Sequence, residues 1–163
     1  MEYCLTAEGL SKHYRHFKAL EGLSIHVPKG SVYGLVGRNG AGKTTLIRLI
    51  CGLQSPTSGE YILYGKKNTE KGIMEARRRM GAVVETPSIY SDMTAEENVR
   101  QQYQILGIPS FEGIRELLDL VGLGDTGKKK AKNFSLGMRQ RLGIAQAIME
   151  DPEFLILDEP FNG

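Results

Sequence analysis

The sequence predicts an α/β fold, and three observations along the chain carry this prediction. Apolar and polar residues alternate in the segment 1–30, which indicates a mainly antiparallel β-subdomain with one exposed face. A short apolar run, a glycine-rich turn and a helical stripe follow one another in 31–87, which is typical of a parallel α/β core. Residues 88–134 have apolar side chains at helical spacing and predict a helical insert. A last helix and strand are predicted in 135–163. The length of 163 residues fits one domain.

Strands are expected where apolar runs end in turn residues. Leu23, Ile25 and Val27 alternate with polar residues before a proline and glycine turn. The apolar run 32–36 has the character of a buried parallel strand. Further strands are expected at 59–65, 81–85 and 154–157, the last of them buried.

Helices are expected where apolar residues recur at intervals of three and four. One follows the glycine-rich turn, a short one ends at the basic stretch 77–79, and two lie in the insert, beginning with a Thr94–Glu97 capping box. A last helix is expected from a Ser135 cap to about Glu150, because the following Asp-Pro sequence breaks it. The predicted core-facing stripes are Leu46, Leu49, Ile50 and Leu53, then Val99, Tyr103 and Leu106, then Ile114, Leu117, Leu118 and Val121.

The glycine-rich turn fits the pattern G-x-x-x-x-G-K-[ST] between a predicted strand and a predicted helix, which is the context of a phosphate-binding P-loop. Its glycines let successive backbone N–H groups approach phosphate oxygens, and the helix N-terminus adds its dipole. Lys43 is expected to reach the β- and γ-phosphates, and the Thr44 hydroxyl to ligate Mg²⁺. The predicted nucleotide-binding residues of this loop are Gly37, Arg38, Asn39, Gly40, Ala41, Gly42, Lys43, Thr44 and Thr45.

Two carboxylates follow the apolar strand predicted at 154–157. Ligands collect at this carboxyl end of the strands in parallel α/β sheets, so the pair together with a P-loop is typical of a Walker B motif. Asp158 suits a Mg²⁺ ion. Glu159 suits the attacking water, so we expect it to be the catalytic carboxylate.

Composition excludes several classes of protein. Lys and Arg number 21 and Asp and Glu 19, and the resulting net charge of +2 points to no particular partner; no nucleic-acid partner is expected. Cys4 and Cys51 have no paired spacing, which argues against a disulfide framework or a zinc site. No apolar run approaches the roughly 18 residues of a membrane span. The six basic residues between positions 126 and 141 are interpreted as a solvated face rather than a nucleic-acid site.

Between the P-loop and the Walker B motif, the sequence 133–141 resembles the signature loop of the ATP-binding cassette (ABC) ATPases, usually written L-S-G-G-Q. The resemblance covers the whole chain and implies a P-loop ATPase that binds ATP and Mg²⁺. It also implies that Ser135 and Gly137 contact the γ-phosphate of ATP bound on a second ABC ATPase domain, in a head-to-tail homodimer. Leu136 and Met138 depart from the family's glycine and glutamine but leave the serine and the last glycine in place.

The resemblance assigns two further residues. Tyr14 stands where the family has its adenine-stacking aromatic, and Glu85 stands where most members have a glutamine that contacts Mg²⁺. The implied metal-binding set is therefore Thr44, Glu85 and Asp158. Glu85, taken with S-L-G-M-R-Q-R-L, resembles the ATPases of bacitracin-resistance and lantibiotic-immunity exporters. This implies a subunit at the cytoplasmic face of the membrane that drives export of a peptide antibiotic or similar substrate through transmembrane permease subunits.

By the same resemblance the chain is a truncated cassette. It stops at 158–163, where the family continues into a D-loop and a switch histidine, and its three histidines all precede the P-loop. We therefore expect this fragment alone to hydrolyse ATP very slowly or not at all. A soluble ABC ATPase of DNA repair or translation is the alternative, although such proteins usually have longer insertions between the Walker motifs. A P-loop kinase or GTPase is a third possibility, for which the signature-like loop would be accidental.

Overall fold

The computed structural model describes residues 2–160, so the end of the predicted truncation, 161–163, lies outside the described residues. By its internal contacts the chain divides into two units, Met1–Met80 and Gly81–Gly163, and each is described by itself. The first unit contains the predicted P-loop, and the second contains the predicted signature loop and Walker B motif.

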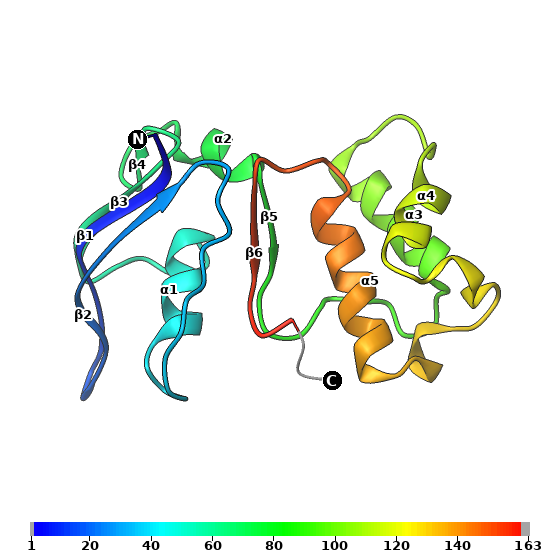
Figure 1. The fold of residues 1–163 in the computed structure, drawn as a ribbon, viewed down its shortest axis with the longest axis horizontal. Helices are drawn as coiled ribbons and strands as arrows, with labels where there is room; N and C mark the ends of the chain where they lie inside the picture. Colours follow the sequence, from blue (N-terminus) through cyan, green and yellow to red (C-terminus); the bar gives the residue numbers. More distant parts are fainter. Residues whose placement is uncertain (1, 161–163) are drawn as a thin grey trace. The chain divides into compact units, whose positions relative to one another are not determined.

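The first unit is built on an antiparallel sheet with the strand order β2-β1-β3-β4 (Figure 1). Its strands are β1 (Tyr3–Tyr14), β2 (Phe17–Pro28), β3 (Ser58–Leu63) and β4 (Lys66–Lys67). Ile25 and Val27 are buried while Ser24 and His26 are exposed, because successive side chains of a strand point to opposite faces. The predicted antiparallel β-subdomain and the strand expected at 59–65 are thus confirmed.

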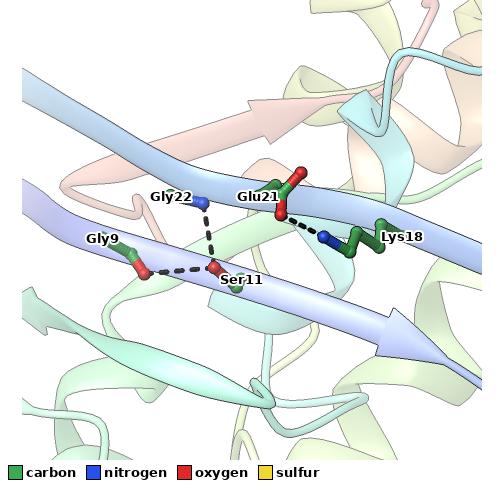
Figure 2. Close-up of polar contacts among 5 residues, drawn as sticks. All are labelled: Gly9, Ser11, Lys18, Glu21 and Gly22. Atoms are coloured by element: carbon green, nitrogen blue, oxygen red, sulfur yellow. Dashed lines mark hydrogen bonds and ion pairs between the residues drawn. The ribbon is translucent and has the colours of Figure 1, made fainter.

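Ser11 holds together an irregular part of the pairing between β1 and β2, where the register shifts (Figure 2). Its buried hydroxyl accepts a hydrogen bond from the Gly22 N–H at 2.8 Å and donates one to the Gly9 carbonyl at 3.3 Å. A bulge leaves backbone groups out of the regular ladder, and this hydroxyl satisfies two of them. On the exposed part of β2, Lys18 and Glu21 form an ion pair.

Two helices complete the regular structure of the first unit. They are α1 (Lys43–Ile50) and α2 (Ile73–Arg78), and α2 ends in basic residues as predicted. Leu46, Leu49 and Ile50 are buried, but Leu53 is 65% exposed, so that part of the predicted stripe is wrong. The reason is that α1 has already ended before Gly52, which adopts a left-handed φ of 76°.

The buried parallel strand expected at 32–36 is not formed. The segment carries no strand pairing to any other described residue, and Val32 and Val36 are 105% and 95% exposed. A parallel strand is buried only when other strands pair with it and helices cover it. The apolar run 32–36 indicates that the segment could form a buried strand, whereas its actual burial depends on strands and helices that pack against it.

The second unit combines a pair of strands with three helices (Figure 1). These are β5 (Met80–Val83), β6 (Phe154–Leu157), α3 (Ala95–Leu106), α4 (Ile114–Leu120) and α5 (Leu136–Ile148), with short 3₁₀ turns at Gly124–Thr126 and Ala131–Asn133. The strands expected near 81–85 and 154–157 are confirmed, although in β6 Ile156 is buried and Leu155 is exposed. The last strand is therefore less buried than predicted.

The helical insert has its own apolar core. Thr94 caps α3 in a reciprocal capping box with Glu97, as predicted. Leu106 is 43% exposed at the end of α3, which corrects the predicted stripe there. The core cluster consists of Ala95, Val99, Tyr103, Ile114, Leu118, Leu123, Ala131, Phe134 and Leu142. Leu142 belongs to α5, so this helix is anchored to the insert by apolar packing.

Candidate functional site

The predicted P-loop is an exposed turn that leads into α1. Gly40 and Gly42 have φ values of 80° and 91°, in the left-handed region that glycine adopts without strain. The Ala41 N–H donates to the Arg38 carbonyl at 3.0 Å and closes the turn. Arg38 and Asn39 are exposed on this turn, while Thr44 and Thr45 lie half-buried in the first turn of the helix. The loop thus leads directly to a helix N-terminus, where anions are favoured.

Gly42 seats the loop on the sheet. A methyl group at Gly42 would lie 2.3 Å from the Ala19 carbonyl oxygen and 2.7 Å from Leu20 Cδ2, which no side chain tolerates. At Gly37 a methyl group would lie 3.1 Å from the Ala41 Cβ, a tight but less severe contact. The last glycine of the motif is therefore required by both its backbone angle and the close approach of β2.

Lys43 is held by the loop itself. Its Nζ donates to the Gly37 carbonyl at 2.7 Å and to the Arg38 carbonyl at 3.2 Å. These bonds hold the ammonium group against the loop that leads into the N-terminus of α1. A cation and unsatisfied helix N–H groups together suit an anion with several oxygens.

Tyr14, at the end of β1, is 38% exposed. Its hydroxyl donates to Gln54 Oε1, and Lys12 Nζ lies 5.2 Å from its ring centroid. Lys12 is fixed in turn by donating to the Ser55 carbonyl at 2.7 Å. The sequence gives no signal for these contacts, because β1 and the turn after α1 lie some 40 positions apart in the chain.

In the second unit, two predicted metal-binding residues follow adjacent strands. β5 and β6 lie side by side and run in the same direction (Figure 1), and the Asp158 N–H donates to the Val83 carbonyl at 2.9 Å. Asp158 is buried, whereas Glu85 and Glu159 are exposed and have left-handed φ values of 59° and 47°. The strand pairing thus brings the segments of Glu85 and Asp158 to the same edge of this small sheet.

The signature-like loop begins α5. Ser135 is the N-cap, and its side chain accepts a hydrogen bond from the Met138 N–H at 3.2 Å, as predicted. A methyl group at Gly137 would meet nothing within 4 Å, so this glycine leaves an open surface beside the cap. Gln140, on the same helix, was missed by sequence reasoning: it is buried, and its Oε1 has no hydrogen-bond partner among the described residues. Glutamine is mostly exposed in proteins, so no sequence signal marks it.

The candidate residues thus form two groups, one in each unit. The P-loop and Tyr14 belong to the first unit, and Glu85, Ser135, Gly137, Asp158 and Glu159 belong to the second. Within residues 2–160 no helix has the length and apolar character that crossing a membrane requires.

Comparisons with known proteins identify the family. A profile described as "ABC transporter" matches residues 20–162. The bacitracin transport ATP-binding protein BcrA of Bacillus licheniformis is 47% identical over 163 residues, covering 100% of this chain and 53% of that protein. The lantibiotic transport ATP-binding protein SrtF of Streptococcus pyogenes is 41% identical over 159 residues, covering 98% and 67%.

A solved structure agrees with these relatives. The "ATP binding subunit of ABC transporter" matches with a TM-score of 0.82 and 33% identity, over 98% of this chain and 67% of that one. The chain spans about half the length of the bacitracin-transport relatives that it matches. The α/β fold class and the resemblance drawn from the P-loop and the signature-like loop are confirmed, and the chain belongs to the ABC transporter family.

Proposed function

We propose that this chain is the ATP-binding part of an ABC transporter and that it binds and hydrolyses ATP with Mg²⁺. The observation that carries the proposal is the P-loop of the first unit, in which Gly42 is pressed on β2 and Lys43 Nζ is held by two loop carbonyls. An ammonium group, a helix N-terminus and a loop without obstructing side chains suit a polyphosphate. The half-exposed ring of Tyr14 suits stacking on adenine.

We propose that oxygen groups of this chain serve as Mg²⁺ ligands. Hydroxyl and carboxylate oxygens are the ligands this ion prefers, and Thr44, Asp158 and Glu85 offer them. When bound, the ion neutralises negative charge on the phosphates. Glu159 is exposed next to the buried Asp158, so we assign it the role of orienting a water molecule from solvent and accepting its proton, while Asp158 keeps the more enclosed position.

The signature-like loop supports a second ATPase domain as partner. Ser135 is exposed at an N-cap and Gly137 leaves open space beside it, so both are accessible to a phosphate presented from outside the chain. We propose that they contact ATP bound to a second copy in a head-to-tail homodimer. Transmembrane permease subunits would complete the assembly, with this part peripheral at the cytoplasmic face of the membrane.

The relatives support a substrate class. BcrA is named for bacitracin transport and SrtF for lantibiotic transport, and this chain is 47% and 41% identical to them. We therefore propose export of a peptide antibiotic or a similar amphiphile. None of the relatives described above is named for DNA repair or translation, so no observation favours the soluble-machine alternative.

Nucleotide titration of a Lys43→Ala variant tests the proposed function. Removing the ammonium removes a charge-assisted contact worth about 1.5–3 kcal/mol, so the affinity for MgATP should fall roughly tenfold to hundredfold. Lys29→Ala is the matched control, because Lys29 lies in the same unit and its ammonium pairs with Glu2 at 2.7 Å on the surface. Equal affinities for the Lys43 variant and the unmodified protein would refute the assignment.

A further inference from the structure

A pocket of about 280 Å³ lies in the first unit, between the end of α1, the start of β3 and α2. Ligand pockets usually begin at about 300 Å³, so this pocket suits a small ligand. Of the ten described residues that line it, Arg77 alone carries a charge, and most of the others present hydroxyl or amide groups. None of the predicted nucleotide-binding or metal-binding residues lines it.

Arg77 is fixed in place by its surroundings. Its Nε donates to the Ile50 carbonyl at 3.3 Å, one Nη donates to the Tyr61 hydroxyl, and the other contacts Met74 Sδ at 3.6 Å. A methyl group at Gly52 would lie 2.4 Å from the guanidinium carbon, so the absence of a side chain there makes room for it. Five N–H groups belong to a guanidinium, which leaves two of them without a partner among the described residues.

The Arg77 charge has no anionic partner in the described part of the chain. No carboxylate forms an ion pair with it there. Burial raises the pKa of the nearby Cys51 thiol to about 11, so that thiol stays neutral at pH 7. A half-buried guanidinium without a counter-charge favours an anion from outside.

Three other polar side chains of the pocket already accept a hydrogen bond. Asn68 Oδ1 accepts from the Tyr61 N–H at 3.1 Å, and Thr57 Oγ1 accepts from the His13 N–H at 2.9 Å. Gln54 Oε1 accepts from a tyrosine hydroxyl. These three side chains therefore offer donors to a ligand, two amide NH₂ groups and the Thr57 hydroxyl hydrogen, in addition to the guanidinium, while the serine and threonine hydroxyls of the pocket can also donate. A pocket that presents donors and a positive charge is complementary to oxygen acceptors.

We propose that this pocket binds a small oxyanion, a phosphate or carboxylate group, through Arg77 with Asn68, Gln54 and Thr57 as additional donors. The planar fork of Arg77 matches both kinds of group, because each presents two oxygens in one plane. The proposal does not depend on nucleotide binding by the P-loop.

The test is calorimetric titration with inorganic phosphate in the Lys43→Ala background, which removes the ammonium that would otherwise attract phosphate to the P-loop. Arg77→Ala removes the charge. Asn68→Asp keeps an oxygen for the Tyr61 N–H, so the fold should be retained. It replaces the NH₂ donor by a negatively charged oxygen, which should repel an anion from the pocket. The matched control is Arg78→Ala, because Arg78 is the next residue, is exposed and pairs with Glu75 at 3.6 Å.

We expect phosphate to bind with a Kd of about 1 mM or tighter, and both site variants to weaken it about tenfold or more while Arg78→Ala does not. Citrate and acetate form a second arm. If a carboxylate binds more tightly than phosphate and its affinity falls as much in the Asn68→Asp variant, the proposal holds and the preferred ligand group is a carboxylate. The proposal is overturned if neither arm binds, or if the control variant weakens binding as much as the site variants do.

Discussion

Pro87 packs against α5 at the position where Gly143 has no side chain. A methyl group at Gly143 would lie 2.4 Å from the Pro87 Cβ and 2.5 Å from its Cγ. Pro87 follows Glu85 by two residues, and Gly143 belongs to the helix that begins after Ser135. The segment that carries the proposed metal-binding carboxylate is therefore packed directly on α5, the helix that begins with the signature-like loop, and this close packing couples the positions of the two.

Gly143→Ala should destabilise the protein although alanine is the better helix former. The new methyl group must displace Pro87, and such overpacking costs about 1–3 kcal/mol, against a gain of about 1 kcal/mol in helix propensity. Gly137→Ala in the same helix meets nothing within 4 Å and should not destabilise it. Urea denaturation of both variants measures the difference, and equal midpoints would show that the Pro87 contact relaxes freely.

Gly42→Ala should cost more stability than Gly40→Ala. Both residues have left-handed φ values, 91° and 80°, so both substitutions introduce similar backbone strain of about 1–2 kcal/mol. Only at Gly42 does the methyl group also collide with the Ala19 carbonyl, at 2.3 Å, whereas at Gly40 it meets nothing. The difference between the denaturation midpoints of the two variants measures the effect of the contact with β2. Equal losses of stability would contradict the close packing of the loop on this strand.

Local motifs could be predicted from the sequence because their partners lie a few residues apart. The Thr94–Glu97 capping box and the Ser135 cap are set by hydrogen bonds across three positions. The two partners are therefore fixed by the same turn of helix. The left-handed glycines of the P-loop follow from the motif in the same way.

Burial could not be predicted where it depends on distant partners. The run 32–36 has strand-like composition, yet Val36 is 95% exposed because no described strand pairs with it. Gln140 is the converse case, because it is a polar residue that the fold buries and that no pattern in the sequence marks as buried. The Tyr14 to Gln54 bond likewise joins residues that only the folded sheet brings together.

The capping box of α3 should contribute a pH-dependent part of the stability. Hydrogen bonds from the Thr94 backbone and side chain hold the pKa of the Glu97 carboxyl below its ordinary value. A lowered folded-state pKa means that this stabilisation is present above the unfolded pKa of about 4.3 and is lost as pH falls through the folded pKa. Glu97→Gln should therefore flatten the acid limb of the stability curve.

Glu96→Gln is the control for this titration, because Glu96 lies in the same turn but bonds to Arg100 at 3.0 Å rather than to the cap. Thermal unfolding followed between pH 3 and pH 7 compares the slopes of the stability curves of the two variants. If both variants keep the slope of the unmodified protein, Glu97 does not carry the acid dependence.

Glu85 should couple the metal site to transport in the assembled transporter. In the proposed site its carboxylate would add negative charge near MgATP, which is favourable only where an oxygen ligates the cation. Glu85→Gln keeps a side-chain oxygen and should retain nucleotide binding, while Glu85→Ala has no oxygen to offer and should lose coupling more severely. Coupled ATPase and antibiotic-resistance assays measure this order, and unchanged values in both variants would make Glu85 a bystander.

Glu159→Gln should separate ATP binding from ATP hydrolysis in the assembled protein. The amide keeps the size of the side chain but cannot accept a proton from water, so turnover should fall by a factor of about 10² or more while binding remains. Loss of a negative charge near the γ-phosphate should also stabilise the closed dimer, because like-charge repulsion decreases.

Phosphate release measures the turnover of the Glu159→Gln variant, and size-exclusion chromatography with ATP measures its dimer. Glu150→Gln is the control and should alter neither, because it changes an exposed acid just after the end of α5, before β6 begins. Normal turnover by the Glu159 variant would assign the base to another residue, because an amide has no basic oxygen with which to activate water.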